Sequence, residues 1–165
     1  YYLQLNGMKP NEIPSSTRRA KQFIGERIEG IDWGQGTAPD AYIATGKLGG
    51  TIFVLDQKEL FGQSDQEKIE TAVDIANKLG IEIIRPDPAQ SAYCNSLMDK
   101  GYTIHELFAF EGGQEKDTYV ATLKRYIERH NLQIPKAYTA LHRRLRNLTY
   151  DKNGKIRKVD DYSFG

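Results

Sequence analysis

The hydrophobic positions of this chain follow two periods, and the change from one to the other separates strands from helices. In the first half, short apolar runs between turn residues predict three strands, at positions 29–33, 41–47 and 51–56. The sequence KLGG at 47–50 is typical of a hairpin turn. The first three strands are therefore expected to be antiparallel neighbours.

The second half predicts helices that alternate with shorter strands. Ser64 and Glu67 have the spacing of a capping box, apolar residues then recur at helical intervals, and Gly80 marks the end of that helix. A nearly continuous apolar run at 81–85 indicates a strand buried between layers. The remaining pattern predicts helices at 89–100, 117–130 and 138–148, with a strand at 102–108. Strands joined through helices pair in parallel, so an α/β fold with a mixed sheet and helices on both faces is expected.

Acidic residues lie at the ends of several of these elements. Asp32 ends the first strand in GIDWGQG, Asp87 follows the buried strand in RPDPAQS, and Asp160 and Asp161 lie near the C-terminus in RKVDDYSFG. Neighbouring strands are about 4.8 Å apart, so carboxylates at their ends converge and repel unless a cation lies between them. Mg²⁺ and Mn²⁺ take oxygen ligands, and two ions about 3.5–4 Å apart suit phosphoryl displacement.

Each of these acids also has a purely structural interpretation. Asp32 could accept hydrogen bonds from the glycine turn that follows it. Asp87, between two prolines, could form an Asx turn or cap the next helix. Asp160 and Asp161 could cap a final helix. The common placement of these acids, together with a basic segment elsewhere, favours metal binding.

Charge is distributed unevenly along the chain, although the formal net charge is only +1. Positions 114–158 carry twelve Lys and Arg against four Asp and Glu, which makes this segment about +8 and the rest about −7. Such a segment favours a polyanion as partner, the alternative being a solvated helix face.

Several function classes are excluded or disfavoured. No apolar run approaches the roughly 20 residues of a membrane span. No GxxxxGK[ST] motif is present, so this segment holds no P-loop ATPase. The single cysteine, Cys94, excludes an intrachain disulfide and a Cys-rich zinc site, and a packing role is expected for it. The chain lacks an initiator Met and is expected to be a piece of a longer protein.

The order of these motifs resembles the nuclease domain of phage large terminase subunits. The resemblance runs from about residue 29 to 165, and its most specific part is DPAQSAYCNSLMDKGY at 87–102. It implies an RNase H-like fold and a metal-dependent endonuclease that cuts concatemeric viral DNA during packaging, in the host cytoplasm. Matched to the family, Asp32, Asp87 and Asp161 or Asp160 would hold two Mg²⁺ or Mn²⁺ ions, although the third ligand could also lie beyond residue 165.

The resemblance also implies partners. Double-stranded DNA would be the substrate, an ATPase motor would precede residue 1 with residues 1–28 as linker or packed extension, and the portal and small terminase subunit would assemble with the whole protein. No membrane partner is expected. Phosphate contacts are expected from basic residues of the C-terminal third: Lys116, Lys124, Arg125, Arg143, Arg144 and Arg146. Two alternatives are a Holliday-junction resolvase or transposase-like nuclease of the same fold, and a non-catalytic DNA-binding or assembly module.

Overall fold

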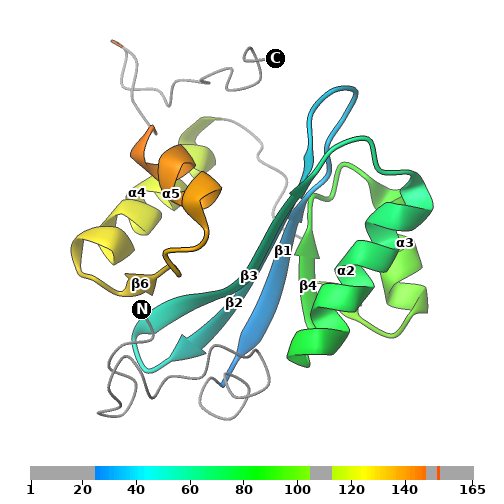
Figure 1. Cartoon of the computed structure of the whole chain (residues 1–165), viewed down its shortest axis with the longest axis horizontal. Coiled ribbons are helices and arrows are strands. Elements are labelled where there is room, and N and C mark those ends of the chain that lie inside the picture. Colours follow the sequence, from blue (N-terminus) through cyan, green and yellow to red (C-terminus); the bar gives the residue numbers. More distant parts are fainter. Residues whose placement is uncertain (1–24, 105–112, 148–151, 153–165) are drawn as a thin grey trace.

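The computed structural model describes residues 25–104, 113–147 and 152. These residues form a six-stranded mixed sheet in the order β5-β4-β1-β2-β3-β6, with helices on both of its faces (Figure 1). Helices α2 and α3 lie on one side of the sheet, and α4 and α5 lie on the other. The α/β fold class expected from the sequence, an RNase H-like mixed sheet with helices on both faces, is thus confirmed.

The first three strands form an antiparallel meander, as predicted. They are β1 (Arg27–Asp32), β2 (Asp40–Leu48) and β3 (Thr51–Leu60). Gly49 lies in the β2–β3 hairpin with a φ of 58°, a left-handed conformation that suits glycine. β1 begins two residues before the predicted strand, and β3 extends beyond its predicted end. Asp32 lies opposite Ala41, and Ala41 lies opposite Glu59, so these three residues form one row across the sheet.

Helix α2 (Asp65–Leu79) begins and ends where the local sequence predicts. The Ser64 side chain accepts a hydrogen bond from the Glu67 N–H, and the Glu67 carboxylate accepts one from the Ser64 N–H. Gly80 ends the helix in the left-handed conformation. The apolar face of α2 is buried on the sheet through Ile69, Ala72 and other residues at helical spacing.

The later elements add parallel strands at both edges of the sheet. β4 (Ile83–Pro86) pairs in parallel with β1, and β5 (Thr103–Ile104) pairs in parallel with β4 after helix α3 (Ser91–Asp99). β6 (Leu132–Gln133) pairs in parallel with β3. It lies between α4 (Gly113–Glu128) and α5 (Thr139–Arg146).

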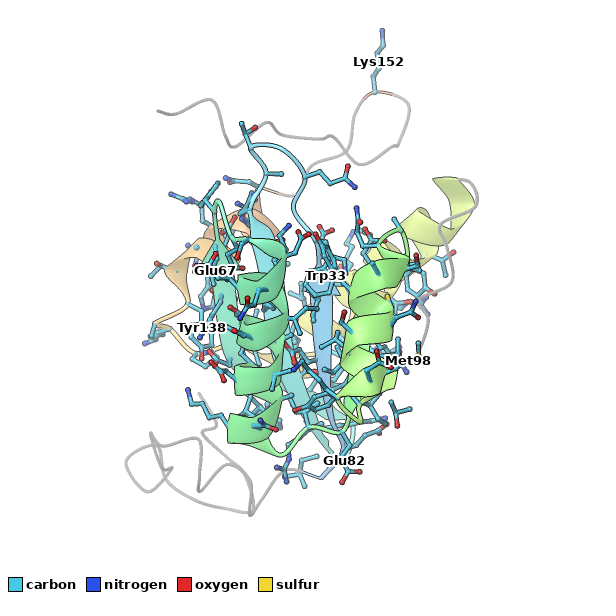
Figure 2. All side chains as sticks on the ribbon, turned by 90° about the vertical axis from the view of Figure 1, so that its right-hand side faces the viewer. Trp33, Glu67, Glu82, Met98, Tyr138 and Lys152 are labelled. Carbon is cyan, nitrogen blue, oxygen red and sulfur yellow. The ribbon has the colours of Figure 1, made fainter. Side chains whose placement is uncertain are left out.

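The hydrophobic core lies between the sheet and the α2–α3 layer. Trp33 is 3% exposed and lies between these two helices over the sheet (Figure 2). Tyr42, Ile84 and Leu97 are fully buried in the same cluster. This packing fixes β1 and β4 side by side, which decides where the acidic residues at their ends lie.

Some predictions concern residues that the structure does not describe. The predicted strand at 102–108 is present as β5, and its last four positions lie outside the described residues. β6 was not predicted. In the described part of the chain, no helix has the length and apolar character needed to cross a membrane.

Candidate functional site

Asp32 and Asp87 lie at the same edge of the sheet, at the carboxyl ends of two adjacent parallel strands. Asp32 is the last residue of β1, and Asp87 directly follows β4. The Asp87 backbone N–H donates to the Ile31 carbonyl at 2.8 Å, which extends the β1–β4 pairing to this point. The register places Pro86 beside Ile31, so its continuation places Asp87 beside Asp32, about 5 Å away between Cα atoms.

Asp32 lines an open hollow of about 440 Å³ on the face of the sheet opposite α2 and α3. Its floor is made by alternate residues of β1 and β2, because successive side chains of a strand point to opposite faces. The lining residues are Ile28, Gly30, Ile31, Asp32, Ala41, Ile43, Thr45 and Arg85. Asp32 is exposed to this space, whereas Ile31 on the other face is buried in the core.

One oxygen of Asp87 has a structural role. Its Oδ1 accepts a hydrogen bond from the Ala89 N–H at 2.9 Å, so the Asx-turn interpretation of this residue is correct in geometry. A carboxylate has about four lone-pair sites, so the turn bond does not prevent Asp87 from binding a cation. The Cys94 thiol lies 3.8 Å from the Asp87 carbonyl oxygen, which ties α3 to the same turn.

The chemistry of this pair fits a hard divalent cation. Two carboxylates at adjacent strand ends supply the oxygen ligands that Mg²⁺ and Mn²⁺ prefer. Within residues 25–104, 113–147 and 152, no three His, Cys, Asp or Glu side chains come together in a group that could hold a metal ion. The predicted third ligands, Asp160 and Asp161, lie outside the described residues.

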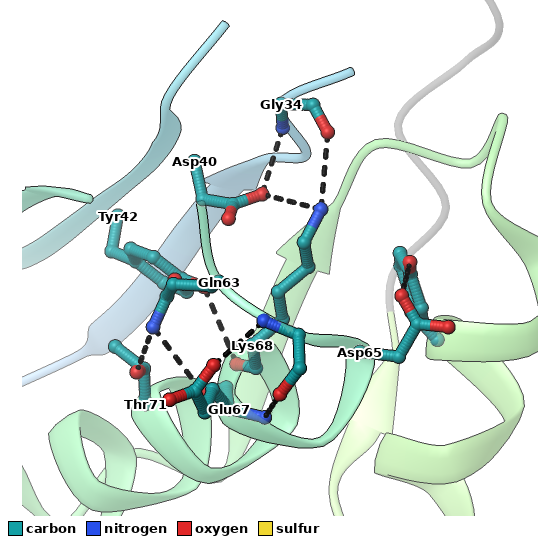
Figure 3. Close-up of polar contacts among 10 residues, drawn as sticks. Gly34, Asp40, Tyr42, Gln63, Asp65, Glu67, Lys68 and Thr71 are labelled. Atoms are coloured by element: carbon teal, nitrogen blue, oxygen red, sulfur yellow. Dashed lines mark hydrogen bonds and ion pairs between the residues drawn. The ribbon is translucent and has the colours of Figure 1, made fainter. Parts of the chain in front are cut away.

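A buried ion pair holds the turn that follows Asp32 (Figure 3). Lys68 of α2 lies 3.1 Å from Asp40, and the side chains of Lys68 and Asp40 are 10% and 3% exposed. Asp40 Oδ1 accepts from the Gly34 N–H at 2.8 Å, and Lys68 Nζ donates to the Gly34 carbonyl at 3.0 Å. A Cβ at Gly34 would come within 2.6 Å of the Pro39 carbonyl oxygen, so only glycine fits there.

Aromatic residues complete this support. Trp33, the residue after Asp32, packs edge-on against Tyr93 of α3 at 4.9 Å and Tyr42 of β2 at 6.2 Å between ring centroids. The Lys68 ammonium lies 5.5 Å from the Tyr93 ring centroid. The Tyr93 hydroxyl donates to Asp65, at the start of α2. The backbone that follows Asp32 is thereby fixed to both core helices.

Helix α5 lies over the same face of the sheet as Asp32. Its Arg144 pairs with Glu59, which shares the cross-strand row of Asp32 and Ala41. Two strand spacings put Glu59, the partner of Arg144, about 10 Å from Asp32. The Tyr138 hydroxyl also donates to the Leu55 carbonyl at 3.2 Å, so two contacts fix α5 to β3.

The other predicted DNA contacts fall into different environments. Arg143 and Arg146 are exposed and line a hollow with Lys136 and His142. Lys124 pairs with Glu128 on the surface of α4 at 3.7 Å, and Arg125 Nε donates to the Ala121 carbonyl. Lys116 belongs to α4, and its side chain is outside the described part. The positions of these basic residues do not test whether they contact DNA, so the DNA contacts stay predictions.

Four residues near the site were not predicted from the sequence. Glu29 is fully buried in β1. Burial raises the pKa of Glu29 to about 9; the Asp56 carboxylate raises it further, and the Lys58 charge lowers it in part. Glu29 alternates with Ile31 and Trp33 on the core face, and this period-2 pattern was a usable signal. Asp40 and Lys68 gave no such signal, because their pairing depends on the packing of α2 on the sheet. Arg85 precedes Asp87 in RPDPAQS, but no role was predicted for it.

Comparison with solved structures finds nuclease domains of phage large terminases. The chain resembles the SPP1 g2p nuclease domain with bound Mn, with a TM-score of 0.63 and 18% identity, over 88% of this chain and 82% of that one. It resembles the large terminase nuclease of the thermophilic phage G20c with bound magnesium, with a TM-score of 0.65 and 15% identity, over 80% and 70% of the two chains.

A third similar structure is a longer large terminase chain from another thermophilic bacteriophage, with a TM-score of 0.67 and 15% identity. The match covers 83% of this chain but only 36% of that one. No protein-family model matches the chain, and no curated protein matches it. At these identities the likeness shows the fold, and at that level the resemblance to terminase nuclease domains is confirmed.

Proposed function

We propose that this chain is the nuclease domain of a phage large terminase, a metal-dependent endonuclease that cuts concatemeric viral DNA during packaging in the host cytoplasm. The observation that carries the proposal is the position of Asp32 and Asp87 at adjacent parallel strand ends, with Asp32 lining an open hollow. The bound Mn and magnesium in the SPP1 and G20c nuclease structures support a divalent cation as cofactor.

In this proposal, Asp32, Asp87 and Asp161 (or Asp160) would together hold two Mg²⁺ or Mn²⁺ ions through their carboxylate oxygens. Such ions, when bound, lower the pKa of a water and stabilise the leaving oxygen. The chain itself holds the carboxylates in place. Lys68 and Asp40 fix the turn after Asp32, and the Ala89 N–H orients Asp87. The exposed arginines of α5 hold the DNA by its phosphates without reading its sequence.

The remaining parts of the proposal concern the whole protein. An ATPase motor would precede the nuclease domain, with residues up to 28 as connector. The match to the longer terminase chain supports this, because the sequence spans about a third of that terminase. The portal and the small terminase subunit would be partners of the assembled protein.

The test is incubation of the chain with supercoiled plasmid in Mg²⁺, in Mn²⁺ and in EDTA. We expect nicking and linearisation with metal, none in EDTA, and none with Asp32→Asn. The matched control is Asp74→Asn, an exposed acid of α2 on the other side of the sheet, which should cut like the wild type. Plasmid cleavage that survives Asp32→Asn would contradict the proposal.

Two further measurements separate this function from its alternatives. Calorimetry with Mn²⁺ should show weaker binding for Asp32→Asn than for the wild type, and equal affinities would favour a non-catalytic module.

Cleavage of linear duplex and of four-way junction DNA should be compared at equal concentration. A strong preference for the junction would indicate a resolvase.

A further inference from the structure

Arg85 lines the same hollow as Asp32. It lies in β4 beside Gly30 of β1, and its side chain is exposed. Asp32 follows Gly30 by two residues, so Arg85 and Asp32 project from the same face of the sheet. The strand rise and spacing put their Cα atoms about 8 Å apart. The guanidinium of Arg85 can therefore reach a molecule that lies in front of Asp32.

The Arg85 guanidinium does not contribute polar contacts to the described part of the fold. Among the residues that the structure describes, the Arg85 side chain takes part in no hydrogen bond or ion pair. Other arginines differ: Arg27 Nη1 donates to the Leu79 carbonyl at 2.6 Å, and Arg144 pairs with Glu59. A guanidinium presents five N–H donors in a planar fork that matches the oxygens of a phosphate.

The floor of the hollow contains two small residues, Gly30 beside Arg85 and Ala41 opposite Asp32. A Cβ at Gly30 would make only an ordinary contact, 3.9 Å from the Ile43 carbonyl oxygen, so the protein's own packing does not require glycine. Glycine weakens a strand interior, and it often marks a position where another molecule approaches the backbone closely. Ala41, opposite Asp32, is also small. The strands thus leave a low surface between Arg85 and the carboxylates.

We propose that Arg85 binds a DNA phosphate over Gly30, next to the phosphate that is cleaved at Asp32 and Asp87. This inference rests on the proposed function and adds a phosphate-binding residue on β4 to the basic residues of α5. The phosphate contact positions the DNA strand in the hollow and carries no sequence information. Since α5 lies over the same face, the DNA is held from both sides of Asp32.

The experiment measures binding of linear DNA in EDTA across a salt series, with single-turnover cleavage in parallel. Arg85→Ala should lower the affinity by about 10- to 100-fold, the effect of losing a hydrogen bond to a charged group. It should flatten the slope of log affinity against log salt by about 0.9. Arg85→Lys should recover part of the affinity, because lysine keeps the charge but not the fork.

Lys100→Ala is the matched control, since it removes one exposed charge at the far end of α3 and should bind like the wild type. Gly30→Val should fold as stably as the wild type but lose DNA affinity. If Arg85→Ala destabilises the fold, Arg85→Gln gives the same comparison with a polar side chain.

Wild-type affinity and salt slope in the folded Arg85 variants would overturn the inference, and Arg85 would then only balance the charge of the two carboxylates. Failure of the wild type itself to bind and cut DNA would instead overturn the proposed function, and this inference with it.

Discussion

At the scale of single residues, Glu29 is the least expected feature of the site's support. It is fully buried in β1, three residues before Asp32, and neither carboxyl oxygen has a hydrogen-bond partner in the described part of the chain. Burial, with the nearby Asp56 carboxylate, raises the pKa of Glu29 to about 9. The side chain is therefore neutral in the folded protein at pH 7 and ionised in the unfolded chain.

Glu29→Gln should change how stability depends on pH. In the wild type the folded state holds a proton that the unfolded chain loses above the ordinary glutamate pKa of 4.5, so stability falls as pH rises from about 5 to about 9. The slope is at most about 1.4 kcal/mol per pH unit for one proton. Gln keeps the shape without the proton, so the variant should lose this slope and exceed the wild type in stability at pH 8.

Urea denaturation of both proteins at pH 5, 6.5 and 8 provides the measurement. Glu82→Gln, at an exposed position just before β4, is the control and should keep the wild-type dependence. Parallel pH curves for wild type and Glu29→Gln would mean that Glu29 is ionised or hydrogen-bonded in the folded protein.

At the scale of elements, the turn between β1 and β2 is held by helix α2 and not by its own sequence. The Gly34 N–H donates to the Asp40 carboxylate, and the Gly34 carbonyl accepts from the Lys68 ammonium. Lys68 lies in the first two turns of α2. The docking of α2 on the sheet therefore sets the backbone that follows Asp32. A buried ion pair that loses one partner leaves an uncompensated charge, which is costly.

Lys68→Met should destabilise the fold by about 3–5 kcal/mol, because Asp40 would remain buried without its cation. Lys78→Met is the control on the same helix. Lys78 lies 3.6 Å from Asp56 but is 57% exposed, and such a pair contributes about 0–1 kcal/mol. Chemical denaturation at pH 7 checks both variants. If both variants lose the same free energy of unfolding, the buried Lys68–Asp40 pair stabilises the fold no more than the exposed Lys78–Asp56 pair does.

The elements predicted correctly from the sequence are those with local signals. Ser64 and Glu67 cap α2, and Gly80 ends it, through contacts within a few residues. β6 could not be predicted, because Leu132 and Gln133 become a strand only by pairing with Ile52 and Phe53, far earlier in the chain. In the same way, the positions of Asp32 and Asp87 at strand ends could be predicted from the local sequence. The Asp40–Lys68 pair could not, because it forms only when α2 packs on the sheet.

At the scale of the whole molecule, the sheet separates stability from chemistry. Helices α2 and α3 cover one face of the sheet and α5 lies on the other (Figure 1). The core lies under α2 and α3, and the hollow at Asp32 lies on the face of α5. Helices α4 and α5 of the basic C-terminal segment thus lie on the same face of the sheet as Asp32. Within this segment, Arg144 is engaged by Glu59, while Arg143 and Arg146 are exposed around a common hollow.

This arrangement predicts different roles for three neighbouring arginines of α5. Each phosphate contact adds about −0.9 to the slope of log affinity against log salt, so Arg143→Ala with Arg146→Ala should flatten the slope by about two units. Arg144→Ala should leave the slope nearly unchanged and instead lower stability slightly, because it removes one of the two contacts that fix α5 to β3. Binding of linear DNA in EDTA from low to moderate salt, with thermal melts of each variant, separates the two effects.

If Arg144→Ala flattens the slope as much as either exposed arginine does, Arg144 exchanges Glu59 for a DNA phosphate on binding, and α5 presents all three side chains to the phosphates. If the double variant keeps the wild-type slope, α5 is a solvated face, and the DNA enters the hollow from the side of β4.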